Sequence, residues 1–365
     1  MHIDDGLVLG DVRPSHVKQD TEEVNAWMET LADSWQEAGF LVRDRTQAGQ
    51  IEKYVGYSIN ACPALLCIPP EKAWDLRESL RVLTKSDQVC VRTLRSLLGI
   101  WIWAALLKRE CLSIPSAVFG FVEKCADRVV PWWPKAREEC VVMYQVLPAI
   151  VCELGAPISQ WVFASDAQGS GEVADTDNGG YGVVASRPAV SVVKEAFLRS
   201  QSSGKTIVRL ADNFTGRRDP SRELIPTLPS SAMPATLLND SLLRWHPIDY
   251  GRWDFSDHIT LGEGRAAVKI SDLLSRRAEC HGMKVLSLED NIPCSGAFNK
   301  GRTSSPALNH ICRRRCSYAV MTGIKQILPW VDSARMPADW LSRYHGAEPL
   351  PEVGGASDGA PEDGR

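Results

Sequence analysis

The sequence predicts an α/β (α+β) protein with more than one domain, and three observations lead to this prediction. The chain has 365 residues, enough for two or three domains of ordinary size. Residues 61–155 are mostly helical by pattern, with one apolar face at helical spacing between residues 91 and 106. Residues 161–345 alternate between short apolar strands and amphipathic helices, which indicates a mixed sheet with flanking helices.

The composition is that of an ordinary soluble globular protein. Hydrophobic residues make up 44% and charged residues 24% of the chain, and the formal net charge is −4. Because this net charge is small, a nucleic-acid-binding surface would have to be a local patch. The longest apolar run, residues 97–107, is far shorter than the ~20 residues of a membrane span, so we expect no membrane association.

Cysteine usage and the first residues indicate a compartment. Eleven cysteines are scattered from Cys62 to Cys316 without CxxC spacing, which favours free thiols in a reducing compartment. His310, Cys312 and Cys316 are neighbours in the sequence, but one such cluster with three arginines inside it is a weak zinc motif. Acidic residues at positions 4 and 5 replace the apolar core of a secretory signal, so we expect a cytoplasmic or nuclear protein.

The N-terminal segment has an acidic turn. Residues 1–10 read as a hairpin with Asp4 and Asp5 at its turn. Paired aspartates exposed there offer hard oxygen ligands for a divalent metal, although Asp-Asp-Gly is also an ordinary turn sequence. The pattern that follows predicts a helix and then two strands, at residues 20–38, 39–42 and 54–59.

The stretch from 161 to 185 places an acidic residue against a hairpin. Residues 161–164 form an apolar strand that ends at Ser165 and Asp166, and residues 180–185 form the returning strand. A carboxylate fixed at a strand end can be held rigidly against a metal. The alternative is a turn aspartate that caps its own backbone.

Three further acids lie at the ends of predicted elements. Glu263 opens a helix that runs to residue 278 and shares its buried face, Asp290 follows a strand at 283–288, and Asp339 lies in the first turn of a final helix. A carboxylate facing the core is costly unless it is paired or binds metal. Salt-bridging or capping of Glu263, and a dipole role of Asp339, remain the alternatives.

A basic stretch lies between the last two of these acids. From residue 291 to residue 331 there is no Asp or Glu, and a last strand is predicted at 327–331. A stretch whose charged residues are all basic can bind the phosphate backbone of a nucleic acid, although the arginines could also form the solvated face of a helix. The candidate nucleic-acid-binding residues are Lys300, Arg302, Arg313, Arg314 and Arg315.

Two family resemblances follow from these motifs. Residues 1–60 resemble the C-terminal part of a reverse transcriptase palm, with Ile3-Asp4-Asp5 as its metal-binding box, a Gly-centred strand, and Arg45 where the family commonly has Lys. Residues 156–345 resemble an RNase H domain of a retrotransposon, of the DIRS-like group or a related LTR-type element. The carriers of this second resemblance are Ser165-Asp166-Ala167, Glu263, Asp290-Asn291 with Asn299-Lys300-Gly301-Arg302, and the closing residues 337–343.

The resemblance implies a chemistry and a domain order. Two Mg²⁺ ions, or Mn²⁺, would be held by Asp166, Glu263, Asp290 and Asp339, and they would support hydrolysis of the RNA strand of an RNA–DNA hybrid. Residues 61–155 would be a helical thumb and connection, residues 187–244 an insert in the RNase H-like domain, and residues 346–365 a disordered tail.

The resemblance also indicates what the chain lacks. The polymerases of this family use a third aspartate on an earlier strand, and that strand and the fingers region would precede Met1. We therefore expect an N-terminally truncated chain that does not polymerise DNA by itself, unless a partner chain supplies the missing half. A further alternative is a catalytically inactive, nucleic-acid-binding remnant.

Overall fold

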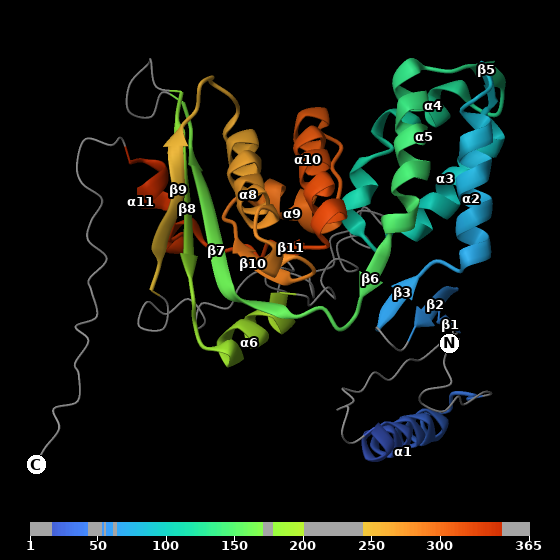
Figure 1. Ribbon diagram of the computed structural model, residues 1–365, viewed down its shortest axis with the longest axis horizontal. Helices are drawn as coiled ribbons and strands as arrows, with labels where there is room; N and C mark the ends of the chain where they lie inside the picture. Colours follow the sequence, from blue (N-terminus) through green and yellow to red (C-terminus); the bar gives the residue numbers. More distant parts are fainter. Residues whose placement is uncertain are drawn as a thin grey trace, which may run out of the picture. The chain divides into compact units, whose positions relative to one another are not determined.

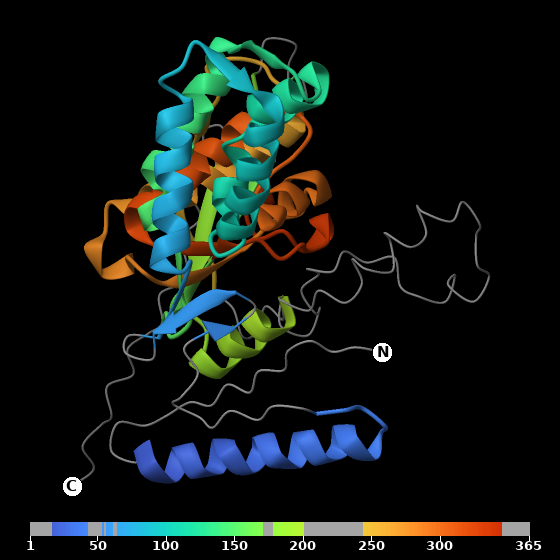
Figure 2. The ribbon, with the colours of Figure 1, turned by 90° about the vertical axis from the view of Figure 1, so that its right-hand side faces the viewer.

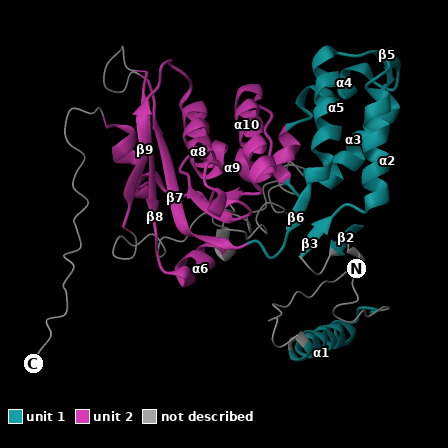
Figure 3. Ribbon diagram, viewed as in Figure 1, with its two compact units in different colours: residues 1–108, 114–156 teal, residues 109–113, 157–365 magenta. Residues whose placement is uncertain are grey.

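The computed structural model describes residues 17–42, 53–54, 56–60, 64–170, 178–200 and 244–344. The chain divides into two compact units, shown in different colours in Figure 3. Unit 1 comprises Met1–Lys108 and Ile114–Ala156, and unit 2 comprises Arg109–Ser113 and Pro157–Arg365. No helix within the described part of the chain has the length and hydropathy required to cross a membrane.

Unit 1 contains a helical group and two small antiparallel sheets. The first sheet has the order β1-β2-β3-β6, and β4 pairs with β5. Figure 2 shows α1 from the side as one unbroken helix. The elements of unit 1 are α1 (Val17–Glu37), β1 (Lys53–Tyr54), β2 (Tyr57–Asn60), β3 (Leu65–Cys67), α2 (Pro70–Leu83), β4 (Gln88–Cys90), α3 (Val91–Ala105), α4 (Ser116–Cys125), β5 (Val129–Pro131), α5 (Pro134–Val146), the 3₁₀-helix η2 (Leu147–Ala149) and β6 (Val151–Glu153).

The core of unit 1 follows the apolar face predicted for residues 91–106. Leu94, Leu98 and Trp101 lie on one side of α3 and are buried. The indole Nε1 of Trp101 donates to the carbonyl oxygen of Met143 on α5 at 3.2 Å, so the largest side chain of this core is also hydrogen-bonded.

Two sequence predictions in unit 1 are wrong, and glycines explain both. Residues 39–42 are a turn and a loop rather than a strand, because Gly39 has φ +87° and turns the chain at the end of α1. Residues 54–59 are not one strand but the hairpin β1–β2, in which Gly56 has φ +82°. A positive φ is a backbone conformation that a strand pattern does not reveal.

Unit 2 contains a five-stranded mixed sheet with helices on both faces, as the sequence predicts (Figure 1). The strand order is β11-β10-β7-β8-β9; β10 is parallel to β7 and β11, and β8 is antiparallel to β7 and β9. The elements are η1 (Arg109–Ser113), β7 (Ile158–Gln168), β8 (Gly180–Ser186), α6 (Val190–Ser200), β9 (His246–Arg252), α8 (Ile259–Ser275), η5 (Ala278–Cys280), β10 (Lys284–Leu288), α9 (Ile292–Lys300), α10 (Pro306–Thr322), β11 (Lys325–Ile327), η6 (Ser333–Arg335) and α11 (Asp339–Ser342).

Alternation along the strands divides the core of unit 2 between the two faces of the sheet. On one face, Phe163 of β7 and Val285 of β10 pack against Ala266 and Ile270 of α8. On the other face, apolar residues of β7 and β10 pack against α6 and α11, where Leu341 is fully buried. The sheet is therefore covered by α8 on one side and by α6 and α11 on the other.

Several boundaries in unit 2 differ from the predicted ones. β7 continues to Gln168, so Asp166 lies inside the strand rather than at its end. The helix α8 begins at Ile259, one turn before Glu263, because His258 caps it by accepting a hydrogen bond from the Thr260 amide. β11 ends at Ile327, earlier than the predicted strand 327–331, and the chain continues to one bridge between Glu289 and Trp330.

Close packing of α11 on β8 gives the first prediction. A Cβ atom built on Gly182 would lie 2.7 Å from the Ser342 amide nitrogen and 2.8 Å from the Cβ of Leu341. Gly182→Ala should therefore destabilise the protein by about 1–3 kcal/mol in urea unfolding, because α11 must move off the sheet. The control is Gly296→Ala in α9, where a Cβ meets no atom within 4 Å; it should stabilise the protein by up to about 1 kcal/mol. Equal effects of the two substitutions would contradict this packing.

Candidate metal centre

Asp166 is held in the middle of the sheet of unit 2. It lies on β7 opposite Gly182 of β8, and its residue is 5% exposed. The hydroxyl of Ser342, at the end of α11, donates a hydrogen bond to Oδ2 of Asp166 at 2.5 Å. The carboxylate of Asp166 is therefore fixed by its place on β7 and by the hydrogen bond from Ser342, whose helix packs on the sheet.

Glu263 reaches the same place from the opposite face. It lies in the second turn of α8, is 4% exposed, and shares its helix face with Ala266 and Ala267, which are fully buried. Its Oε2 atom is buried and has no hydrogen-bond partner. Glycine precedes it at position 262, where a Cβ would lie 3.3 Å from Ala167, so α8 approaches β7 closely at this point.

Asp290 stands in the short connection between β10 and α9. The side chain of Asn291 caps α9 by accepting a hydrogen bond from the Cys294 amide at 3.0 Å. The indole Nε1 of Trp330 donates to the carbonyl oxygen of Asp290 at 2.7 Å. Both contacts hold the backbone around Asp290, whose side chain is half-buried.

The ligand atoms of Asp166, Glu263 and Asp290 all lie within 4.8 Å of one another. The strand register explains why two of them meet: Leu288 of β10 is level with Ala164 of β7, so Asp290 follows level with Asp166. Within the described residues, none of the three carboxylates forms a salt bridge. Buried hard oxygen ligands at this spacing suit a divalent cation.

The pKa values of these three acids follow from burial and mutual repulsion. Burial raises the pKa of Asp166 to about 7; the Ser342 hydrogen bond opposes this, and the charges of Asp290 and Asp339 add to it. Burial, followed by the charges of Glu289, Asp166 and Asp290, raises the pKa of Glu263 well above its usual value. Burial also raises the pKa of Asp290. A bound cation would relieve both causes.

The fourth predicted acid, Asp339, is not in this group of three. It begins α11, and its carboxylate forms an ion pair with Arg343 at 2.9 Å. The Asp339 side chain is 44% exposed. Its charge nevertheless raises the pKa of both Asp166 and Asp290, so it lies at the rim of the site.

Glu289 is an acidic residue of the site region that sequence analysis did not select. It is 0% exposed, and neither carboxyl oxygen has a hydrogen-bond partner of ordinary geometry. Burial, then the charges of Asp290 and Asp166, raises its pKa; the Asn291 amide and the Cys294 thiol oppose this. The sequence signal for Glu289 is its position next to Asp290, directly after β10. The sequence pattern does not show that both of these adjacent acids lie near the site.

The five predicted basic residues have different environments. Lys300, Arg302 and Arg314 are exposed. Arg313 is half-buried and donates to the carbonyl oxygen of Ser113 at 3.0 Å. His310 is also exposed whereas Cys312 and Cys316 are buried, so these three do not share an environment that would suit zinc.

Arg315 is not available to a nucleic acid, and this part of the prediction is wrong. Its side chain is buried, pairs with Glu110 at 3.3 Å, and donates to the carbonyl oxygens of Phe298 and Gln326. Its guanidinium also lies 5.0 Å from the centre of the Phe298 ring. Asp4, Asp5 and Arg45, the other residues of the predicted motifs, lie outside the described residues.

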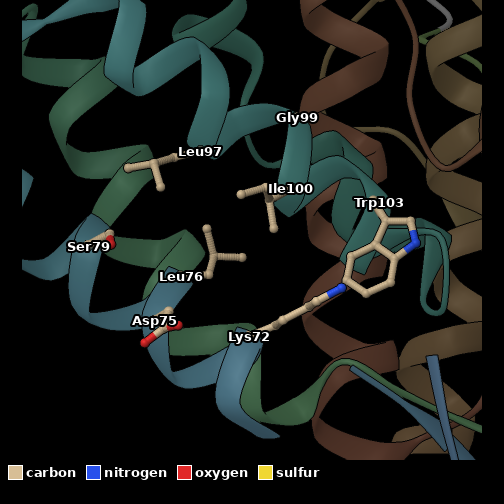
Figure 4. Close-up of a pocket in the computed structure, with 8 residues that line it drawn as sticks. All are labelled: Lys72, Asp75, Leu76, Ser79, Leu97, Gly99, Ile100 and Trp103. Carbon is tan, nitrogen blue, oxygen red and sulfur yellow. The ribbon is translucent and has the colours of Figure 1, made fainter. Parts of the chain in front are cut away.

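Unit 1 has a cavity of about 520 Å³ between α2 and α3. Its wall is largely apolar, and Figure 4 shows the amine of Lys72 directed at Trp103, with 5.6 Å from Nζ to the ring centroid. The lining residues are Lys72, Asp75, Leu76, Ser79, Leu97, Gly99, Ile100 and Trp103. None of the predicted catalytic acids is among them.

The raised pKa of Asp166 gives a second prediction. Well below pH 4 this carboxyl is protonated in both folded and unfolded chains, and near pH 4 its ionisation in the unfolded chain changes the free energy of unfolding only slightly. As the pH rises towards 7, ionisation favours the unfolded state, because the folded pKa is the higher one. Asp166→Asn should thus stabilise the metal-free protein at pH 8, by up to about 4 kcal/mol, and have little effect at pH 4. Thermal unfolding in EDTA at both pH values tests this, and equal stabilisation at both would contradict it.

No protein-family model matches the chain, and no curated protein matches it. Among solved structures, the chain is similar to the foamy viral protease-reverse transcriptase in complex with an RNA/DNA hybrid, with 8% identity and a TM-score of 0.21. The similarity covers 75% of this chain and 49% of that one, so the chain spans about half the length of that protein. A similarity at this level is too low to transfer a fold or an activity.

Proposed function

We propose that unit 2 is an RNase H-type endoribonuclease that hydrolyses the RNA strand of RNA–DNA hybrids with a divalent cation. The observation that carries this proposal is the convergence of the Asp166, Glu263 and Asp290 carboxylates within 4.8 Å of one another. They come from a strand, a helix and a strand end separated by more than 20 residues at each step, so tertiary structure alone brings them together.

The order of the elements supports the same proposal. The acids occur along the chain on a strand, a helix, a strand end and a final helix, which is the order that the sequence resemblance implies. In unit 2, β7 and β10 are adjacent parallel strands, and α8 and α11 cover opposite faces of the sheet. The acids therefore meet from both faces at one end of this strand pair.

The donor set fits Mg²⁺ or Mn²⁺ better than it fits zinc. All three ligands are carboxylate oxygens, and the buried Oε2 of Glu263 has no hydrogen-bond partner. Divalent cations bound in such a site would lower the pKa of a water molecule and neutralise charge on the leaving oxygen. Asp166, Glu263 and Asp290 would hold them, and Asp339 would complete the set from the rim.

The chain's own residues orient these groups and bind the substrate. Ser342 keeps one oxygen of Asp166 in place, and the Asn291 cap holds the Asp290 backbone. The exposed residues Lys300, Arg302 and Arg314 follow the site in the sequence and would contact the phosphate backbone of the hybrid. Contacts to 2′-hydroxyl groups would then distinguish the RNA strand.

The remaining parts of the proposal rest on the sequence resemblance. Residues 1–60 would be the C-terminal part of a reverse transcriptase palm, residues 61–155 a thumb and connection, and residues 156–345 the RNase H-like domain of a retrotransposon-derived chain. Such a protein would act in the cytoplasm or nucleus.

A second candidate function is nucleic-acid binding without catalysis. The observation that favours it is the ion pair between Asp339 and Arg343, which engages the fourth acid outside the group of three. Cleavage assays separate the two candidates, because a protein that only binds nucleic acid would retain the hybrid but not cut it.

The third prediction concerns catalysis. With Mg²⁺, the full-length protein should cut a hybrid labelled on its RNA strand, and Asp290→Asn should slow cleavage by about 100-fold or more, because a charged ligand is lost. Asp254→Asn, which changes an exposed acid outside the group, is the matched control and should cut as fast as wild type. If wild type and Asp290→Asn cut equally slowly, the protein is not a nuclease.

The fourth prediction contrasts two adjacent arginines. Arg314→Ala should weaken hybrid binding and reduce the slope of log affinity against log salt concentration by about one, with stability unchanged, because Arg314 is exposed. Arg315→Ala should instead destabilise the fold by about 3–5 kcal/mol, because it leaves the largely buried Glu110 and the carbonyl oxygens of Phe298 and Gln326 without this partner. Salt-dependent binding and urea unfolding measure the two effects. Unchanged stability of Arg315→Ala together with a destabilised Arg314→Ala would contradict the assignment of Arg314 to the nucleic-acid-binding surface and of Arg315 to the core.

A further inference from the structure

Glu289 is a fully buried acid that packing alone does not explain. It follows β10 directly and bridges to Trp330 through the backbone, so its position is fixed. Both of its carboxyl oxygens are buried and have no hydrogen-bond partner of ordinary geometry; the groups beside the carboxyl are the Asn291 amide and the Cys294 thiol. A side chain without an ionisable group would be far less costly at such a position, so the presence of an acid calls for an explanation beyond packing.

The alternation of β10 shows where the Glu289 side chain lies. Val285, Ser287 and Glu289 share one face of the strand, and Val285 packs against Ala266 and Ile270 of α8. Glu289 thus faces α8, the helix that carries Glu263, whereas Asp290 faces the side of Asp166. Oε2 of Glu263 is a further buried oxygen without a hydrogen-bond partner.

Glu289 is nevertheless not one of the three acids whose ligand atoms lie within 4.8 Å of one another. Glu289 precedes Asp290 in the sequence. Its charge acts on Glu263 of α8, and its carboxyl group is next to the Cys294 thiol in the first turn of α9. Cys294 of α9, also fully buried, is beside both glutamates and offers no positive charge. The guanidinium of Arg315 also acts on Cys294, but it is paired with Glu110, so the group of three is the neighbouring site left to hold a neutralising cation.

We propose that Glu289 is a positioning residue of the metal centre, whose negative charge behind Glu263 strengthens divalent-cation binding by Asp166, Glu263 and Asp290. Electrostatic attraction through a low-dielectric interior acts without direct ligation. The cation in turn neutralises the buried charge. This inference rests on the metal centre of the proposed function, but it does not require that the protein cleave RNA.

The test is Mn²⁺ binding to the 365-residue chain, measured through the electron paramagnetic resonance signal of the free ion. Glu289→Gln should weaken Mn²⁺ binding by about 10–100-fold, the range for residues that support metal ligands. The same variant should unfold at a higher temperature than wild type in EDTA and gain less from added Mn²⁺, because a buried charge without a partner is gone. Should the glutamine variant not fold, Glu289→Met provides a second uncharged side chain of similar length.

Two controls separate charge from packing. Ser287→Ala changes a buried residue on the same face of β10, whose hydroxyl also lacks a partner, and it should leave Mn²⁺ affinity unchanged. Glu289→Asp keeps the charge and should bind Mn²⁺ more tightly than Glu289→Gln.

Four results have stated meanings. Wild-type Mn²⁺ affinity in the Glu289→Gln and Glu289→Met variants would overturn the inference, and so would an equal loss in Ser287→Ala. Absence of Mn²⁺ binding to the wild-type protein would overturn both the inference and the metal centre. Weakened Mn²⁺ binding in the charge-free variants, together with no hybrid cleavage by wild type, would support the inference and reject the nuclease.

Discussion

The mutual repulsion of three carboxylates in a largely buried site is the constraint on which unit 2 depends. Asp166, Glu263 and Asp290 bring their oxygens within 4.8 Å of one another, although burial and like charge both oppose ionisation there. The site can persist because Asp166 and Glu263 lie on regular elements, and Asp290 lies in a short connection between β10 and the capped helix α9. In the absence of a cation, unit 2 holds these groups together at a cost in stability, and this is the expected sign of a preorganised metal site.

The packing of the sheet supplies the rigidity that this arrangement requires. Gly182 lets α11 lie directly on β8, and α11 in turn places the Ser342 hydroxyl on Asp166. On the opposite face, His258 caps α8 and so sets the position of Glu263 one turn later. Stability and function are therefore coupled: a small change in how either helix contacts the sheet would displace a carboxylate.

The mixed sheet could be predicted from sequence, and so could the elements that carry or precede Asp166, Glu263 and Asp290, because these elements have clear periodicity. Local patterns could not show what depends on tertiary contacts. β9 follows the insert and has no strong strand pattern, and two neighbouring acids in sequence do not reveal that Glu289 points inward. The arginine run likewise gave no sign that Arg315 is buried against Glu110, because that partner is 205 residues away.

The most direct test of the metal centre is anomalous diffraction from crystals of the full-length protein grown with MnCl₂. The account predicts anomalous density between the carboxylates of Asp166, Glu263 and Asp290, with manganese–oxygen distances of about 2.0–2.3 Å. Asp166→Asn crystals prepared in the same way should lose most of that density. Density elsewhere in the molecule with none among these three carboxylates, at Mn²⁺ concentrations that saturate the protein, would contradict the account.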